Sequence, residues 1–179
     1  MFLLVLPAPS CKSFLSRSID NRATYLGRCN MKKDSGRVIV RPIAEDEIPE
    51  MIDVWKASGL PYKPRGRDSL RNLTAQRKDD PDLFLGAFVS GRMVGVALAS
   101  DDGRRAWINR VAVIPQARRR GVALALIDRA EKIMKRRGRR LFCMQVEAQN
   151  QLSMRLLKRA GYRHEHEILY FTKREKKSY

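Results

Sequence analysis

Hydrophobic and polar positions along this chain follow two periods, one typical of strands and one typical of helices. Alternating or β-branched stretches predict strands at residues 37–43, 83–89, 92–99, 106–113, 141–146 and 162–172. Apolar positions three and four residues apart predict helices at residues 46–59, 69–78, 121–137 and 151–160. Ser90 and Gly91 predict a hairpin turn between two of the strands. The resulting order, β-α-α-β-β-β-α-β-α-β, predicts an α/β domain without internal repeats.

Polar residues mark the starts of the first two predicted helices. Asp46 is the expected cap of the first helix, and Asp68 or Ser69 is the expected cap of the second. In the second helix, Leu70 and Leu73 are expected to face the core because they lie three residues apart.

The composition describes a basic globular protein. Of its 179 residues, 44% are hydrophobic, which is enough for a sizeable core in one domain. Lysine and arginine number 37 against 19 aspartates and glutamates, a net charge of +18 that attracts polyanions. No apolar run reaches the roughly 18 residues that a membrane span needs, so we expect no membrane association. Three scattered cysteines indicate a cytoplasmic protein without a disulfide framework or metal site.

The first 35 residues differ from the rest of the chain. Residues 2–6 are apolar, but two prolines follow and no positive stretch precedes them, unlike a secretory signal. The next residues are rich in serine and basic groups and faintly resemble an organelle transit peptide. We expect residues 1–35 to be a disordered tail or a mis-assigned start, with translation beginning at Met31, and the folded domain to span residues 36–175.

The most informative stretch is residues 111–123, where a strand leads through a basic turn into a helix. The first N–H groups of a helix lack partners, and its dipole places about half a positive charge there. Arg118, Arg119 and Arg120 add fixed charge, and Gly121 lets a ligand approach the main chain. This combination suits a pyrophosphate group, although the spacing matches neither a Walker loop nor a dinucleotide-binding fingerprint.

The same stretch carries a resemblance to a known family. Arg118, Gly121 and Ala123 resemble the Q/R-x-x-G-x-G/A motif of the GCN5-related N-acetyltransferases (GNAT). Residues 150–162 resemble the family's second motif, an asparagine followed by a small residue and a helix that ends in glycine and an aromatic residue. The resemblance covers about residues 37–173. It implies a mixed, mainly antiparallel central sheet with flanking helices.

The resemblance also implies an activity, the transfer of an acetyl group from acetyl-CoA to a primary amine of a small molecule or protein. Main-chain N–H groups and guanidinium groups of the basic turn would hold the pyrophosphate, and the preceding strand would pair with the pantetheine arm. Asn150 would reach that arm or a bound water. The cofactor-binding residues expected on this basis are Val111, Ala112, Val113, Arg118, Arg119, Arg120, Gly121, Val122, Ala123 and Asn150.

Two positions depart from the family's pattern. Leu157 stands where relatives often have a tyrosine that protonates the departing thiolate, and Gln145 stands where relatives often have a glutamate base. Glu147 is therefore the candidate catalytic base. Its alternatives are Asp101, Asp102 or an ordered water, and Glu147 also fits a solvated loop carboxylate.

The basic residues suggest a second class of function. Residues 104–140 carry thirteen lysines and arginines against two acidic residues. A solvated basic face accounts for this excess, and contact with RNA, a ribosome or another polyanion is the alternative. A non-catalytic basic module of the same fold that binds RNA or ribosomes is thus the alternative function.

Overall fold

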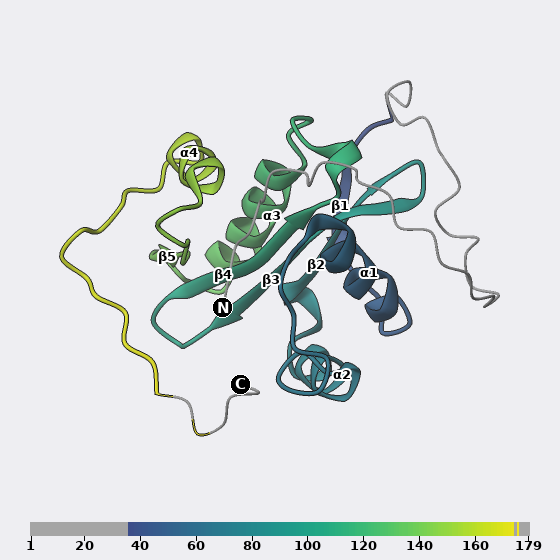
Figure 1. Ribbon diagram of the computed structural model, residues 1–179, viewed down its shortest axis with the longest axis horizontal. Helices are drawn as coiled ribbons and strands as arrows, with labels where there is room; N and C mark the ends of the chain where they lie inside the picture. Colours follow the sequence, from purple (N-terminus) through teal and green to yellow (C-terminus); the bar gives the residue numbers. More distant parts are fainter. Residues whose placement is uncertain (1–35, 174, 176–179) are drawn as a thin grey trace, which may run out of the picture.

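A computed structural model describes residues 36–173 and residue 175, so the expectations for residues 1–35 lie outside its scope. At its centre is one five-stranded sheet in the order β1-β2-β3-β4-β5 (Figure 1). Neighbouring strands are antiparallel except for β4 and β5, which are parallel. The strands are β1 (Ile39–Pro42), β2 (Phe84–Val89), β3 (Arg92–Asp101), β4 (Ala106–Val113) and β5 (Phe142–Cys143). The predicted mixed, mainly antiparallel sheet is confirmed.

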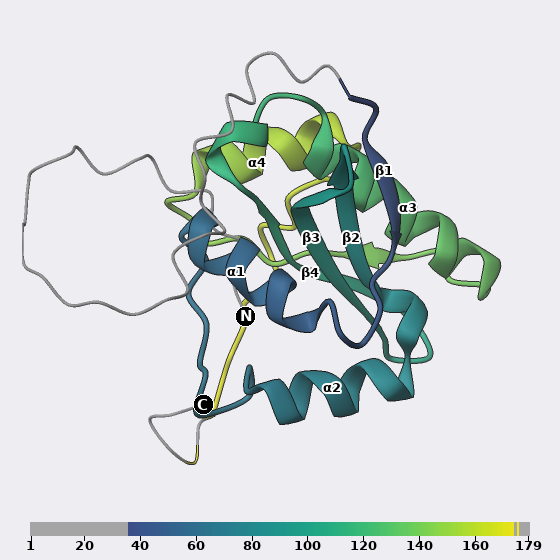
Figure 2. The same ribbon diagram turned by 90° about the vertical axis from the view of Figure 1, so that its right-hand side faces the viewer.

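Helices cover both faces of the sheet (Figures 1 and 2). On one face lie α1 (Ile48–Ser58) and α2 (Leu70–Asp79), and on the other lie α3 (Val122–Arg136) and α4 (Gln151–Arg159). Each face has its own apolar core. One core combines the sheet with α3 and part of α4, and the other combines the sheet with α1, α2 and the chain after α1. Among the described residues, no helix has the length and apolar character that crossing a membrane requires.

Strand β4 contributes to both cores because its side chains alternate. Val111 and Val113 belong to the core beneath α3, whereas Ala112 belongs to the core beneath α1. A glycine in β3 brings α3 close to the sheet. A Cβ atom at Gly95 would lie only 2.9 Å from Cγ1 of Val122, the first residue of α3. The start of α3 is therefore packed directly on the centre of the sheet.

The starts of the first two helices were predicted with mixed success. Ser69 caps α2 as expected, because its hydroxyl accepts the Asn72 N–H at 3.3 Å. Asp46 does not cap α1; the helix begins at Ile48, and the residue before it is Glu47. The Glu47 carboxylate accepts the Ala44 N–H at 2.7 Å, so the acid one position later occupies the turn.

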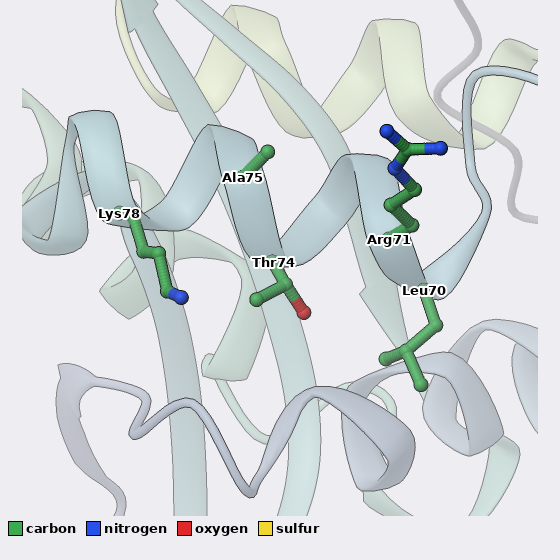
Figure 3. Close-up of a pocket in the computed structure, with 5 residues that line it drawn as sticks. All are labelled: Leu70, Arg71, Thr74, Ala75 and Lys78. Atoms are coloured by element: carbon green, nitrogen blue, oxygen red, sulfur yellow. The ribbon is translucent and has the colours of Figure 1, made fainter.

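The inward orientation expected for Leu70 is wrong. Leu73 is buried, but the first residue of α2 is 52% exposed because the apolar face of this helix is narrow. Leu70 borders a shallow, open depression with Arg71, Thr74, Ala75 and Lys78 (Figure 3). All five residues belong to α2, so the depression includes no residue of β4 or of the basic turn.

Of the strands predicted in the C-terminal part of the chain, one is shorter than expected and the others are not formed in the described residues. The expected strand at 141–146 is reduced to β5, which pairs only with Ala106 and Trp107 of β4. The expected strands at 162–172 are not formed in the described residues, where that segment is an exposed chain with four adjacent apolar side chains at 168–171. Alternation gives a strand only where main-chain groups find a neighbouring strand, and these residues have none.

Candidate active site

The parallel pair β4 and β5 separates soon after it forms. Pairing ends at Trp107 and Cys143, and residues 144–147 are not a strand. Beyond Trp107, the described part of the chain provides β4 with a partner only on the β3 side. On that side of β4, the described residues therefore leave main-chain groups of Val111, Ala112 and Val113 without a strand partner.

A β-bulge interrupts β4 just before this open edge. Val96 of β3 pairs with Ala112, but Leu98 pairs with Asn109, so the β4 side contains an extra residue. Arg110 lies in the bulge with a φ angle of 51°, a left-handed conformation that is uncommon for residues other than glycine. Bulges of this kind redirect a strand and are frequent beside active sites.

The basic turn after β4 has the main-chain shape of an anion-binding cradle. Arg119 and Gly121 are both left-handed, with φ angles of 63° and 77°, and α3 begins at Val122. The Ala125 N–H donates to the Gly121 carbonyl at 2.9 Å. The main-chain N–H groups of the residues that precede Ala125 in the first turn have no acceptor within the helix. They point outward from the helix start, where an anion can accept their hydrogen bonds. We use "cradle" below for residues 119–123.

The side chain of Arg118 binds main-chain groups of β4 and α1. Its Nε donates to the Val113 carbonyl at 3.2 Å, and its Nη2 donates to the Ser58 carbonyl at 2.9 Å. Burial lowers the pKa of Arg118 below its usual value. Arg118 thus joins the cradle to β4 and to the end of α1, whereas the side chain of Arg119 is exposed beside the cradle.

Asn150 lies at the start of α4 and caps it. Its side-chain oxygen accepts the Ser153 N–H at 3.1 Å, and the residue is only 7% exposed. The Ser153 hydroxyl is also buried and has no hydrogen-bond partner among the residues that the structure describes. The second sequence motif therefore places two buried polar side chains, those of Asn150 and Ser153, in the first turn of α4.

Glu147 lies between β5 and α4, in the chain that has left the sheet. Its carboxylate accepts a hydrogen bond from Gln149 Nε2 at 2.9 Å, and its carbonyl accepts the Asn150 N–H at 2.9 Å. The side chain is half-buried and has no cationic partner in the described chain. It is thus available to accept a proton.

The alternative bases are committed to other contacts. The Asp101 carboxylate accepts hydrogen bonds from Arg139 Nε at 2.6 Å and from the Gly103 N–H at 2.8 Å. These contacts lower its carboxyl pKa. Asp102 accepts main-chain N–H groups at the end of the hairpin and Trp107 Nε1 at 3.0 Å, which lower its pKa well below the usual range. A carboxylate with a lowered pKa is a weaker base, so Asp101 and Asp102 are poorly suited to accept a proton.

The position that relatives often give to a tyrosine is part of the core here. Leu157 is 9% exposed and packs in the apolar cluster beneath α3. Tyr162, five residues later, donates its hydroxyl to Glu131 of α3 at 3.0 Å, and burial raises its pKa above the usual range. Neither residue has the character of an acid that protonates a thiolate.

Sequence reasoning overlooked one residue at this site. Arg110 is only 4% exposed and lies 3.4 Å from the carboxylate of Asp68, which was expected only as a helix cap. The signal in the sequence was an arginine among the apolar residues of a strand, at a position that alternation alone would place in the interior.

Comparison with known proteins identifies the family. The model of the acetyltransferase (GNAT) family matches residues 43–162. An acetyltransferase of Photorhabdus laumondii subsp. laumondii is 33% identical over 136 residues, which cover 75% of this chain and 94% of the relative. The fold is similar to that of PaiA N-acetyltransferase from Thermoplasma acidophilum, whose structure is in complex with coenzyme A. The TM-score is 0.60 at 22% identity, and the match covers 72% of this chain and 91% of that one.

A second solved structure has the same fold. It is that of AAC(6')-Iy in complex with a bisubstrate analogue, with a TM-score of 0.63, 18% identity and coverage of 77% of this chain and 99% of that one. The expectation of an acetyl-CoA-dependent N-acetyltransferase is confirmed at the level of the family. With the motifs, the open edge of β4 and the cradle all in place, the chain belongs to the acetyltransferase (GNAT) family.

Proposed function

We propose that this acetyltransferase binds acetyl-CoA along the open edge of β4 and transfers the acetyl group directly to a primary amine. One observation carries the proposal: no described strand pairs with the β5 side of β4 at Val111–Val113, and this edge leads through the short segment 114–118 to the cradle at 119–123. Pantetheine would pair with the edge as an added strand does, and the pyrophosphate would accept hydrogen bonds from the cradle. Asn150 would contact the pantetheine arm directly or through water.

The reaction needs an amine without its extra proton and a stabilised carbonyl oxygen. The amine nitrogen attacks the thioester carbon, the carbonyl oxygen becomes negative, and the C–S bond then breaks. A main-chain N–H at the bulge of β4 would stabilise that oxygen, an effect of about 3–4 kcal/mol for one well-placed donor. Coenzyme A leaves as a thiolate of pKa near 8.5, which tolerates the absence of a dedicated acid at Leu157.

Glu147 is the proposed base. Its half-buried carboxylate lies in the chain that separates from β4, and no cation competes for it in the described residues. It would accept the proton that the attacking amine loses, directly or through one water. The favoured status of Glu147 rests on its contacts, since Asp101 and Asp102 are held by arginine, tryptophan and main-chain donors.

The charge of the protein indicates which acceptors it favours. A net charge of +18 favours acceptors that are acidic or presented on acidic surfaces. The basic segment 104–140 attracts polyanions less strongly than its composition suggests, because six of its cations form ion pairs of 4 Å or less with carboxylates. These are Arg105, Arg110, Lys132, Lys135, Arg137 and Arg139. RNA or ribosome contact therefore stays a prediction, as does a cytoplasmic location.

Amine-dependent release of coenzyme A tests the proposal. The full-length chain is incubated with acetyl-CoA and, in turn, with small amines, an aminoglycoside and peptides with acidic or basic N-terminal residues, and thiol release is followed with a disulfide dye. The proposal expects release that depends on one amine class, with the acetylated amine found by mass spectrometry. Thiol release that is equal with and without every amine would contradict it.

A further inference from the structure

A buried arginine occupies the bulge of β4. The Arg110 guanidinium lies 4.0 Å from the centre of the Trp55 ring, and its Nη2 lies 3.2 Å from the Pro61 carbonyl and 3.4 Å from a carboxylate oxygen of Asp68. The side chains of Arg110 and Asp68 are each 5% exposed. A residue of the acetyl-presenting strand thus reaches into the connection between α1 and α2.

Arg110 carries several features that cost free energy in the folded state. Its main chain adopts a left-handed conformation, burial lowers its pKa to about 10, and its Nε and Nη1 have no hydrogen-bond partner among the described residues. Well-packed apolar residues commonly replace a buried ion pair without loss of stability. Several local costs at one residue are expected at functional positions rather than at purely structural ones.

The contacts of Arg110 hold one loop, residues 60–69, which we call the clamp loop. Asp68 organises this loop from within, because its carboxylate accepts the Lys63 N–H at 2.7 Å and its own N–H donates to the Lys63 carbonyl at 3.3 Å. Arg110 then binds the loop at both ends, at Pro61 and at Asp68. Between these points the loop exposes Lys63, Pro64 and Arg65 to solvent.

We propose that Arg110 is a positioning residue that holds the clamp loop beside the open edge of β4, where the loop forms one wall of the acceptor site. The inference rests on the proposed function, because Arg110 directly precedes Val111, the first residue expected to pair with pantetheine. A ligand paired with that edge occupies the side that faces β5. The attacking amine would then approach beside the bulge, on the face of the sheet that α1 covers, where Arg110 contacts Trp55 and the clamp loop.

Replacement of Arg110 separates positioning from folding. Arg110→Met keeps the length of the apolar stem and removes the contacts to Pro61 and Asp68, and Arg110→Lys restores a charge opposite Asp68. The control is Arg137→Met, which breaks an ion pair of 2.6 Å with Asp80 near the end of α3. Three quantities are compared in the full-length chain: the Kd for acetyl-CoA by calorimetry, kcat and KM for the amine that the wild type acetylates, and hydrogen exchange of the clamp loop.

The expected pattern is specific to positioning. Arg110→Met leaves the Kd for acetyl-CoA within about twofold, lowers kcat/KM for the amine at least tenfold, and speeds exchange of the Lys63 N–H, which the loop protects. Arg110→Lys recovers part of kcat/KM, and Arg137→Met changes none of the three. Asp68→Asn, which keeps the side-chain shape, gives the pattern of Arg110→Met and serves as the second test if the methionine variant does not fold.

Two results overturn the inference. One is unchanged kcat/KM in a folded Arg110→Met or Asp68→Asn variant, and the other is an equal loss of acetyl-CoA affinity, which would mean a general disturbance of β4. Failure of the proposed function gives a different result, because the wild type itself would then release no coenzyme A with any amine.

Discussion

Arg118 Nε donates a hydrogen bond of 3.2 Å to the carbonyl of Val113, the last residue of β4. The same guanidinium donates through Nη2 to the carbonyl of Ser58, the last residue of α1. One side chain therefore fixes the direction in which the chain leaves the strand and enters the cradle. The motif arginine thus holds the main chain from which the cradle is built.

Replacing Arg118 should affect stability and affinity together. Arg118→Met leaves two carbonyls without their donor, which costs about 1–3 kcal/mol in unfolding free energy and releases the cradle. Arg118→Lys keeps the charge, but its single nitrogen cannot reach both carbonyls. We therefore expect it to bind acetyl-CoA almost as weakly as Arg118→Met. Urea unfolding and acetyl-CoA calorimetry measure the two effects. Retention of wild-type affinity in Arg118→Lys would show that the charge alone is used.

Exposed Arg119 is the matched control. Arg119→Met removes a charge beside the same turn without breaking a hydrogen bond to β4, so it should lower affinity modestly and leave unfolding unchanged. Its effect on affinity should weaken as salt rises, because exposed charges are screened.

Loss of the Glu147 carboxylate should slow transfer and leave cofactor binding intact. Glu147→Gln keeps the shape but cannot accept a proton, so we expect kcat to fall by about 10²–10⁴. The control is Glu165→Gln, an exposed carboxylate in the C-terminal chain. Rates are followed with the best amine over a range of pH. If Glu147→Gln kept at least half of the wild-type kcat, an ordered water would become the favoured base.

Asn150 should show a structural effect that can be separated from its contact with the cofactor. Asn150→Ala removes the cap of α4 and should cost about 1 kcal/mol in unfolding free energy. Asn150→Asp keeps a capping oxygen but loses the amide donor. We expect Asn150→Asp to unfold like the wild type while binding acetyl-CoA more weakly. Equal affinity in that variant would restrict Asn150 to capping.

The Asp101–Arg139 pair should make stability depend on acid. Arg139 holds the carboxyl pKa of Asp101 below its usual value, so the contact stabilises the folded state fully above the unfolded pKa of about 3.9. That contribution is lost as pH falls through the lower folded pKa. Asp101→Asn should therefore be less stable than the wild type at pH 7, by about 0.5–1 kcal/mol, and the difference should shrink as the pH falls below the unfolded pKa of about 3.9.

Urea unfolding at several pH values measures that difference. Arg139→Met is its partner variant and should show the same dependence, because it removes the other half of the pair. A gap between Asp101→Asn and the wild type that stayed constant down to pH 2 would mean that the pair is not its source.

The sequence predicted the parts of the fold that local signals determine. The alternation of β4, the hairpin turn at 90–91 and the glycine at the start of α3 all have causes within a few residues, and the structure contains all three. The family motif at 118–123 added the chemistry. Its main-chain geometry, with left-handed Arg119 and Gly121, suits the anion that the motif implies.

The incorrect predictions concern features that depend on residues far apart in the sequence. Strand formation at 141–146 and 162–172 depends on a neighbouring strand, and β4 supplies one only at Ala106 and Trp107. Contacts of Arg110 and Arg118 join residues 42 to 60 positions apart, to Asp68 and Ser58, and no local pattern announces them. The sequence therefore indicated a basic site but could not show which arginines turn inward.

Whether the cradle binds coenzyme A is decided by the affinity of the full-length chain for acetyl-CoA, measured by calorimetry for the wild type and for Gly121→Glu. Gly121 and Gly138 are both exposed, both left-handed, and both have open space where a Cβ would be, so Gly138→Glu is the matched control for the strain. The account predicts micromolar binding in the wild type and in Gly138→Glu, and a loss of at least tenfold in Gly121→Glu, where the carboxylate opposes the pyrophosphate. Equal affinity in all three proteins, or no binding by the wild type, would contradict it.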